Sequence, residues 1–208
     1  MRVDAGVDWL GRLGEDEADV IVLTHGHPDH AFGLQDGADC PVYATHDTWR
    51  LIRQFPIEQS RELPTRRTVD LGGIAVEAFP VEHSVNAPAV GLHIAAGRWA
   101  VFYAPDVVSI LDRRAALDDV DIYIGDGSSI QRSLVRRTKR GLVGHAPVRT
   151  QLGWCEQEGV SEAVFTHCGT PIVEGDERKL GPEVRRLGRE RGVNAQLAHD
   201  AQIVAVSP

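Results

Sequence analysis

The stretch that most constrains this chain is residues 24–30, which read Thr-His-Gly-His-Pro-Asp-His. They follow directly on the apolar run at residues 20–23, Val-Ile-Val-Leu. Such a run predicts a buried strand that ends where the histidines begin. A bend at this point would display three imidazoles and one carboxylate together. The loop is therefore the first candidate for a functional site.

The spacing inside this loop suits two neighbouring metal ions. His25 and His27 alternate with small or rigid residues, so both can point to one side of an irregular turn. Asp29 and His30 follow at once and can reach an adjacent position. Imidazole nitrogen suits zinc and related metals, and carboxylate oxygen serves as a further ligand. The alternative is a polar loop that is rich in histidine by chance.

Length and composition bound the kind of protein. The 208 residues are enough for one domain, residues 1–208, and 42% hydrophobic with 25% charged residues is ordinary for a globular chain. No apolar run approaches the length of a membrane span, and residues 1–6 lack a signal-peptide core. Cys40, Cys155 and Cys168 are too few and too spread for a disulfide framework. We therefore expect a cytoplasmic protein with free thiols and no membrane partner.

The formal net charge of −8 narrows the choice of partners. Sequence-independent binding to long nucleic acid depends on Lys and Arg that neutralise phosphates, so an acidic chain is poorly suited to it. A small phosphorylated substrate remains compatible, because two bound divalent metals would make the site locally positive.

Hydrophobic periodicity and turn residues predict short strands alternating with helices. The expected strands cover residues 19–23, 40–44, 74–80, 90–95, 99–103, 121–124, 163–166, 193–198 and 202–206. The expected helices cover residues 9–13, 47–54, 110–117, 148–158 and 177–191. Gly181-Pro182 would interrupt the last helix. Residues 55–72 are expected to form an irregular connection, and the basic run at residues 132–140 a solvated helix face.

Histidine or aspartate recurs just past the ends of the predicted strands. His27, His83, Asp106 and His167 all occupy such positions. Functional groups at strand ends gather on one rim of a sheet, where a rigid scaffold holds them. The four residues are therefore expected to meet.

In this order, the motifs resemble those of the metallo-β-lactamase superfold, and the resemblance covers nearly the full chain. Residues 24–30 stand as its His-x-His-x-Asp-His loop. His83 and Asp106 stand as the next two motifs, and His167 as the last ligand histidine. The resemblance implies an α+β fold, a four-layer αβ/βα sandwich with two sheets face to face and helices outside. It also implies a two-metal site on one edge.

The same resemblance assigns the ligands of two divalent metal ions, with zinc expected and manganese or iron also compatible. One ion would be held by His25, His27 and His83. The other would be held by Asp29, His30 and His167, with Asp106 bridging both.

His145 narrows the branch within the superfold, because it precedes His167 by 22 residues with a helix and a strand between them. This is similar to ribonuclease Z and to the cyclic phosphodiesterases of phosphonate breakdown, where an extra histidine acts beside the leaving group. The resemblance implies that His145 is a general acid, or a positive group against developing phosphate charge. The alternative is that it only caps the helix starting at Pro147. His145, Asp106 and Asp29 are thus the predicted catalytic residues.

The chain departs from the family pattern in two places. The family normally has an opening pair of strands before the segment that corresponds to residues 3–6. We therefore expect an N-terminally shortened fold whose sheet edge is exposed or covered by a homodimer partner. Only 39 positions separate Asp106 from His145, which leaves no room for the substrate arm of the nucleic-acid-cleaving branch. Together with the negative charge, this argues against large RNA as substrate.

The leading hypothesis is a dinuclear metal hydrolase in which a metal-bound hydroxide attacks a small phosphodiester in line. A thioester or lactone hydrolase of the glyoxalase branch is the first alternative. A metal-stabilised binding module without catalysis is the second. A redox role like that of the diiron flavoproteins is disfavoured, because His27 stands where those proteins carry a glutamate.

Other polar residues are assigned structural roles. His46 and His93 are expected at the surface or in strand packing, and His199-Asp200 in a structural turn. Asp4 is expected to support the metal loop through hydrogen bonds to its ligands. Ser128 and Ser129 could touch a substrate, although a Gly-Ser loop is more often only a turn.

Overall fold

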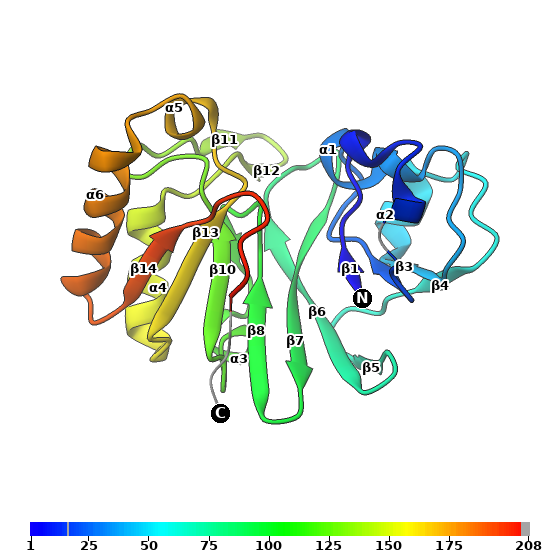
Figure 1. The fold of residues 1–208 in the computed structure, drawn as a ribbon, viewed down its shortest axis with the longest axis horizontal. Helices are drawn as coiled ribbons and strands as arrows, with labels where there is room; N and C mark the ends of the chain where they lie inside the picture. The colour runs from blue at the N-terminus through cyan, green and yellow to red at the C-terminus, as the bar shows by residue number, and fades with distance from the viewer. Residues whose placement is uncertain (16, 205–208) are drawn as a thin grey trace.

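The computed structural model describes residues 1–15 and 17–204, and two β-sheets form its centre (Figure 1). The first sheet has four parallel strands in the order β1-β2-β3-β4. Its strands are β1 (Arg2–Val3), β2 (Ile21–Val22), β3 (Val42–Ala44) and β4 (Ser60–Glu62). β1 therefore lies at one edge of this sheet.

The second sheet has eight strands, seven of them in the order β14-β13-β10-β8-β7-β6-β5, with β9 paired to β6. They are β5 (Thr68–Asp70), β6 (Ile74–Glu82), β7 (Ala89–Ala96), β8 (Trp99–Tyr103), β9 (Ser109–Ile110), β10 (Ile122–Asp126), β13 (Glu162–Thr166) and β14 (Asn194–Leu197). β6, β7 and β8 pair antiparallel, whereas β8, β10, β13 and β14 pair parallel. The carboxyl ends of β6, β8, β10 and β13 therefore lie at one edge.

Helices cover the outer faces of both sheets. They are α1 (Pro28–Ala31), α2 (His46–Leu51), α3 (Arg113–Ala116), α4 (Val148–Glu158), α5 (Thr170–Val173) and α6 (Glu177–Arg189), with 3-10 turns η1 (Val7–Trp9), η2 (Leu13–Glu15) and η3 (Phe32–Leu34). No helix in the described part of the chain combines the length and apolar character needed to cross a membrane.

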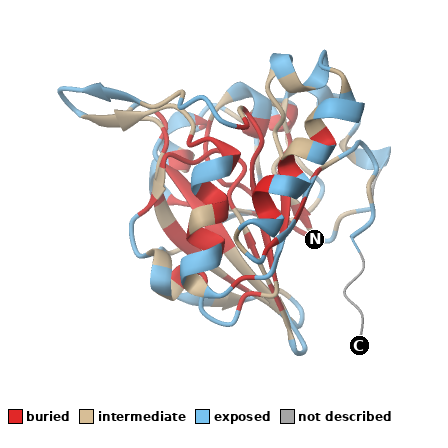
Figure 2. Cartoon of the chain, turned by 90° about the vertical axis from the view of Figure 1, so that its left-hand side faces the viewer, coloured by how far each residue is buried: buried red, intermediate tan, exposed pale blue. Residues whose placement is uncertain are grey.

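Three hydrophobic clusters join these layers, and Figure 2 shows their buried residues inside a shell of exposed ones. β2 explains the arrangement, because its side chains alternate between faces. Ile21 packs under the helices of the first sheet, and Val22 packs against β6 and β7 of the second. Burial on both faces is the reason the run at residues 20–23 is wholly apolar. The predicted four-layer sandwich is thus present.

Several predicted elements differ from those observed. The helix expected at residues 9–13 is replaced by the 3-10 turns η1 and η2. The connection expected at residues 55–72 contains β4 and β5, whose residues are largely exposed and carry no apolar alternation. The helix expected at residues 110–117 shrinks to α3, because Ser109–Ile110 pairs with β6 as β9.

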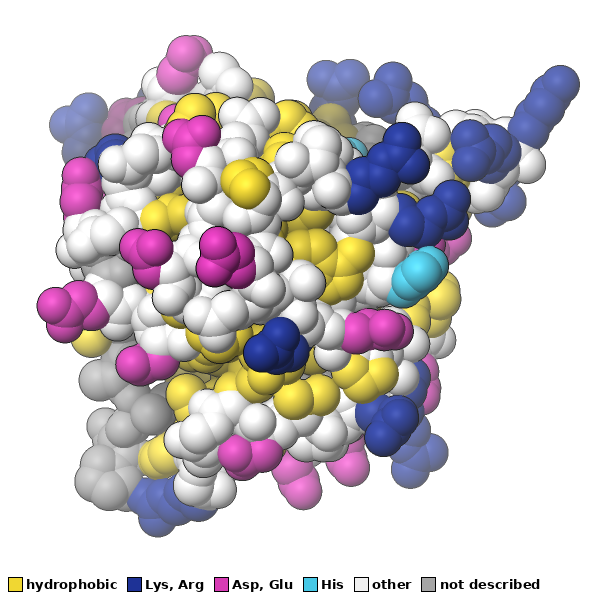
Figure 3. Space-filling view, turned by 90° about the vertical axis from the view of Figure 1, so that its right-hand side faces the viewer, with side chains coloured by type: hydrophobic (Ala, Val, Ile, Leu, Met, Phe, Trp, Pro, Cys, Tyr) yellow, Lys and Arg dark blue, Asp and Glu magenta, His cyan; other side chains and the backbone are white. Residues whose placement is uncertain are grey.

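The basic segment at residues 132–140 is not a helix face. Its second half begins the hairpin of β11 (Arg136–Thr138) and β12 (Gly141–Val143), which projects from the body at the upper left of Figure 2. Lys and Arg side chains gather where it projects, at the upper right of Figure 3. Gly141 has a positive φ of 143°, a conformation that glycine adopts readily and that lets the chain turn back tightly. The helix prediction for this segment did not allow for such a turn.

The end of the chain also differs in detail. α6 runs without interruption through Pro182, which lies on its exposed face. Burial of Val184 and Leu187 on the opposite face offsets the hydrogen bond that proline removes. In the predicted strand at residues 202–206, residues 202–204 are irregular, and residues 205 and 206 lie outside the described part.

Candidate metal centre

The histidine loop leaves β2 of the first sheet and enters α1 at the rim where strands of the second sheet end. Pro28 occupies the first turn of α1, where its missing N–H is no loss, and His27 is the N-cap. Asp4 holds the loop from below, because it accepts hydrogen bonds from the backbone N of Thr24 at 2.7 Å and from its Oγ1 at 2.8 Å. The loop is therefore fixed before any ligand binds.

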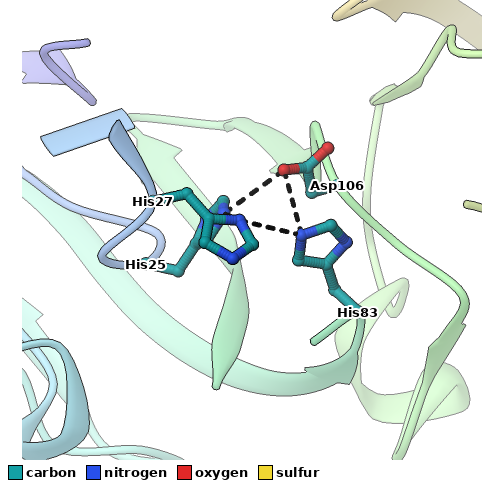
Figure 4. Close-up of side chains that lie close together, drawn as sticks. All are labelled: His25, His27, His83 and Asp106. Carbon is teal, nitrogen blue, oxygen red and sulfur yellow. Dashed lines mark hydrogen bonds and ion pairs between the residues drawn. The ribbon is translucent and has the colours of Figure 1, made fainter. Parts of the chain in front are cut away.

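Four of the predicted ligands converge on one point (Figure 4). Nδ1 of His27 lies 3.0 Å from Nε2 of His25 and 3.2 Å from Nε2 of His83. Oδ2 of Asp106 lies 3.2 Å from Nε2 of His25 and 3.4 Å from Nε2 of His83. Three imidazole nitrogens and one carboxylate oxygen in this arrangement match the donor set of zinc and similar metals.

The other three predicted ligands form a second cluster beside the first. Nε2 of His167 lies 3.2 Å from Oδ2 of Asp29, and Nε2 of His30 lies 3.7 Å from the same oxygen. Oδ2 of Asp106 also lies 3.2 Å from Nε2 of His30. Asp106 therefore faces both clusters, as a bridging carboxylate would.

Polar atoms without hydrogen bonds test whether these residues fit a metal. Among the described residues, Nε2 of His30, Oδ1 of Asp106 and Nδ1 of His167 are buried and have no hydrogen-bond partner. Nδ1 of His167 is 3.1 Å from Oδ1 of Asp106, but the geometry is not that of a hydrogen bond. Leaving such atoms unsatisfied costs about 1–3 kcal/mol each. Cations between the clusters would give the inward-facing atoms partners, so the residues fit divalent metals.

The pKa values of His27 and His83 favour the neutral rings that can bind a metal ion. Burial lowers the pKa of His83 to about 4 and also lowers that of His27, so both rings are neutral near pH 7. Burial alone would raise the pKa of Asp106, but the imidazoles of His25 and His30, each 3.2 Å from its Oδ2, outweigh burial and hold this pKa far below its usual range. Burial lowers the pKa of His30, but the neighbouring carboxylates of Asp106 and Asp4 outweigh burial and raise this pKa to about 10. A metal must therefore displace a proton from His30.

Outer hydrogen bonds orient the ligand rings, as Asp4 was predicted to do. Oδ2 of Asp4 lies 2.7 Å from Nδ1 of His30, which turns Nε2 of that ring inward. Nδ1 of His83 lies 3.2 Å from the backbone O of Gly144. Asp4 and His167 have positive φ values of 60° and 52°. Backbone strain of this kind at non-glycine residues is concentrated at functional sites.

His145 lies at the outer edge of the two clusters. Its ring centroid is 5.1 Å from that of His83 and 6.0 Å from that of His167. Pro147, not His145, is the N-cap of α4, and no side chain caps that helix, so the helix-cap alternative is wrong. The structure thus brings His145 together with the predicted ligands.

Asp126 is the residue that the sequence analysis missed. It is fully buried, and its Oδ2 lies 2.7 Å from Nδ1 of His145. Burial opposes the His145 proton, but the hydrogen bond and charge of Asp126 outweigh it and raise the pKa of His145. Asp126 ends β10 just as Asp106 follows β8, so the strand-end rule could have found it. The glycines and serines around it were instead interpreted as a plain turn.

Fully buried hydrogen bonds hold Asp126 in place. Its carboxylate accepts from the backbone N of Val107 at 3.1 Å and of Ser128 at 2.8 Å. Gln151 of α4 accepts from the Asp126 N–H at 2.9 Å and donates to its carbonyl at 2.7 Å. These contacts make the Asp126–His145 pair a rigid part of the site.

Four polar residues that were expected to have structural roles lie away from the two clusters. His46 is exposed at the start of α2, and His93 is half-buried in β7. His199 and Asp200 are exposed, and His199 lies 3.4 Å from Glu177. Ser128 and Ser129 lie beside His145, with Oγ of Ser128 3.2 Å from its Nδ1.

Comparison with known proteins identifies the family. A family model described as the beta-lactamase superfamily domain matches residues 2–168, which is most of the chain. This chain belongs to the beta-lactamase superfamily. A comparison with curated protein sequences finds no significant match.

Solved structures confirm that the fold is the metallo-β-lactamase fold of this superfamily. The metallo-beta-lactamase fold protein YhfI from Bacillus subtilis matches with a TM-score of 0.70 at 15% identity, over 94% of this chain and 83% of that one. A diphosphatase from the PhnP family matches with a TM-score of 0.67 at 24% identity, over 95% and 76%. The short form of human tRNase Z matches with a TM-score of 0.65 at 15% identity, over 99% and 88%. At these identities the matches establish the shared fold alone.

Proposed function

We propose that this superfamily member is a dinuclear metal hydrolase that cleaves a small phosphodiester. His25, His27 and His83 would hold one divalent ion, and a second set would hold the other. That second set is Asp29, His30 and His167, with Asp106 shared between the two ions. The convergence of these donors, with buried atoms that lack hydrogen bonds, supports the assignment. Zinc suits the donor set, and manganese or iron also suits it.

Bound metals would supply Lewis-acid stabilisation of phosphate charge and a water molecule acidic enough to react near pH 7. The chain itself would supply the proton for the departing oxygen. Asp126 accepts the Nδ1 proton of His145 and raises the pKa of that ring, which favours the form in which Nε2 also carries a proton. Nε2 makes no hydrogen bond to any described residue and is free to donate it. Asp29 and Asp106 would contribute negative charge that keeps both ions in place.

The Asp126–His145 pair is the observation that favours a phosphoester over other bonds. A protonated imidazole beside two metal clusters suits an alkoxide leaving group that needs a proton. The structural neighbours include a diphosphatase from the PhnP family, so the same fold also carries an enzyme that cleaves a bond to phosphorus.

His145→Ala tests the proposal with two diesters, bis-p-nitrophenyl phosphate and methyl phenyl phosphate. The loss of a general acid should lower kcat by about a hundredfold or more on the phenyl diester. The p-nitrophenyl diester should lose much less, because its leaving group departs without a proton. Metal content should remain two ions per chain. His93→Ala, on β7 outside the site, is the control and should match the unmodified protein.

A substrate panel separates this proposal from its alternatives. Turnover of a thioester or lactone with no diester cleavage would contradict it and favour the glyoxalase-like reaction. Tightly bound metal without turnover of any ester would favour a binding module. Metal analysis of the purified protein would identify the ions.

We also propose that a second copy of the chain covers the edge of the first sheet at β1. The edge of a sheet can be extended by a strand of another chain. Sedimentation should give twice the 22.7 kDa chain mass. A monomer at micromolar concentration would contradict the homodimer without affecting the hydrolase assignment.

A further inference from the structure

A cavity of about 670 Å³ opens beside His145, whose side chain forms part of its lining. Its walls are the segment from Ser128 to Leu134 and the residues that begin α5, with Leu180 and Glu183 of α6 behind them. This volume falls within the range of roughly 300–1,000 Å³ that holds small-molecule ligands in proteins. His145 and Ser128 belong both to the cavity and to the site described above, so the two are continuous.

The walls of this cavity are largely aliphatic. Ile130, Leu134, Ile172 and Leu180 line it, with Pro171 at its edge. Ile172 and Leu180 are partly buried and rest on the main hydrophobic cluster, so a rigid support stands behind them. An aliphatic surface of this kind gains free energy when an apolar group displaces its water.

Charge is sparse in the cavity. Arg132 and Glu183 are its charged side chains apart from His145. Glu183 accepts a hydrogen bond from Nε2 of Gln131, which partly satisfies it within the protein. The side chains of Ser128, Ser129 and Gln131 also line the cavity but already have hydrogen-bond partners within the protein. The lining thus offers few free polar groups to a sugar or to a second phosphate, both of which need several polar partners.

His145 stands between the metal clusters and the cavity. Its ring contacts His83 edge-on and stacks near His167, and the same ring forms part of the cavity wall. A group attached to the oxygen that receives the His145 proton would extend into this space. The cavity is therefore placed for the departing half of a substrate.

We propose that this cavity binds an apolar, uncharged leaving alcohol, so that the substrate is a phosphodiester with one aliphatic or aromatic substituent. The inference rests on the proposed phosphodiesterase function and specifies its substrate class. Hydrolysis forms a P–O bond to the oxygen of water and breaks the P–O bond to the alcohol. The proton of Nε2 of His145 passes to the alcohol oxygen, and a proton released from water restores His145. The products are a phosphomonoester and an apolar alcohol.

A series of methyl 4-acylphenyl phosphates, from acetyl to octanoyl, tests the inference. The acyl carbonyl keeps the acidity of the leaving phenol nearly constant, so only the length of the alkyl chain changes along the series. We expect kcat/KM to rise about fourfold per methylene until the cavity is filled. Binding of the free 4-octanoylphenol, measured by calorimetry, should be tighter than that of 4-acetylphenol by the same progression.

Two tryptophan substitutions on α5 provide the matched variants. Thr170 lines the cavity, and Thr170→Trp should block it. We expect this variant to lose at least about tenfold of the octanoyl-substrate activity, equivalent to the binding of two methylenes or more, and to lose less of the acetyl-substrate activity, because the shorter group fills less of the cavity. Val173 is 71% exposed and does not line this cavity, so Val173→Trp should leave both activities unchanged.

The outcomes distinguish the cavity from the reaction. If kcat/KM for diester cleavage does not depend on chain length and both phenols bind equally, the cavity assignment is overturned, whereas the proposed phosphodiesterase function stands. A different result would be that the protein binds 4-octanoylphenol, that Thr170→Trp abolishes this binding, and that no diester is cleaved. This result overturns both the phosphodiesterase function and the leaving-alcohol role of the cavity. Loss of acetyl-substrate activity in Thr170→Trp equal to the octanoyl loss also overturns the cavity assignment.

Discussion

At the scale of single residues, the site depends on side chains that hold other side chains. Asp4 orients His30, Gly144 orients His83 through its carbonyl, and Asp126 orients His145. Each partner fixes one ring nitrogen and leaves the other for chemistry. Small displacements of these partners would therefore alter the reaction while the metal ligands remain.

Asp126→Asn is expected to lower kcat by about a hundredfold, since the amide no longer holds the His145 proton. Asp126 raises the pKa of His145, and the general acid must be protonated, so activity falls as pH rises through that pKa. In the variant this fall should begin at a lower pH. The measurement is kcat against pH with metal content determined in parallel. Asp118→Asn, at an exposed position, is the control, and an unshifted alkaline limb in Asp126→Asn would refute the positioning role.

At the scale of elements, β10 and α4 set the position of the Asp126–His145 pair. Gln151 of α4 reaches across to β10 and bonds Tyr123, the Asp126 backbone and the carbonyl of Ala146. Gly125 allows this close approach, because a Cβ there would collide with the Tyr123 ring and with Oε1 of Gln151. Glycine is required here for contact and not for an unusual turn.

Gly125→Ala should therefore destabilise the fold by about 1–3 kcal/mol through overpacking. It should also lower kcat, because displacement of Gln151 moves the Asp126 backbone. Urea unfolding monitored by tryptophan fluorescence measures the first effect. The matched control is Gly153→Ala in α4, where a Cβ meets nothing within 4 Å and the helix should gain about 0.5–1 kcal/mol. Equal stability of the two variants would contradict the packing argument.

The hairpin of β11 and β12 is the element expected to attract anionic substrate. Its cations are exposed, and its base adjoins the site, because the backbone N of Gly144, directly after β12, donates to the backbone O of His83. We expect replacement of its four cations by glutamine to raise KM for an anionic diester about threefold or more at low salt, with kcat unchanged. The four substitutions are Arg136→Gln, Arg137→Gln, Lys139→Gln and Arg140→Gln.

The control for the hairpin variant removes the same charge from α6, with Arg178→Gln, Lys179→Gln, Arg185→Gln and Arg186→Gln. It should change KM little, because an effect of net charge alone would appear equally in both. Tight, salt-dependent binding of RNA by the unmodified protein would contradict the expectation of a small substrate.

At the scale of the whole molecule, the proposed metals join the two sheets. Four of the ligands follow β2 of the first sheet, whereas His83, Asp106 and His167 follow strands of the second. A ligand that binds only the folded state adds about 2.7 kcal/mol at a hundredfold excess over its Kd. Removal of metal with a chelator should therefore lower the Tm by roughly 5–10 °C for a chain of this length. Calorimetry with and without the chelator measures the shift, and an unchanged Tm after proven metal loss would contradict it.

Much of the fold and of the candidate metal cluster could be predicted from local patterns. The apolar run at residues 20–23 predicted β2, and alternation predicted β6. By contrast β4, β5 and β11 are short and mostly exposed, so no hydrophobic pattern marks them. Pairing with a neighbouring strand decides that such segments are extended, and pairing is not a local property.

By itself, the sequence predicted which donors gather in the candidate metal centre, from the spacing of residues 24–30 and from a motif order that resembles the metallo-β-lactamase superfold. Residues 24–30 contain their chemistry and spacing within one short loop. Only the tertiary structure decided that Asp126 holds His145, and that a cavity lies beside that ring. Both depend on the packing of α4, α5 and α6 against the second sheet, which places residues far apart in the chain within contact distance. Packing between side chains far apart in the chain produces no periodic pattern in the sequence. For that reason the Asp126–His145 contact and the cavity beside it could be found only in the structure.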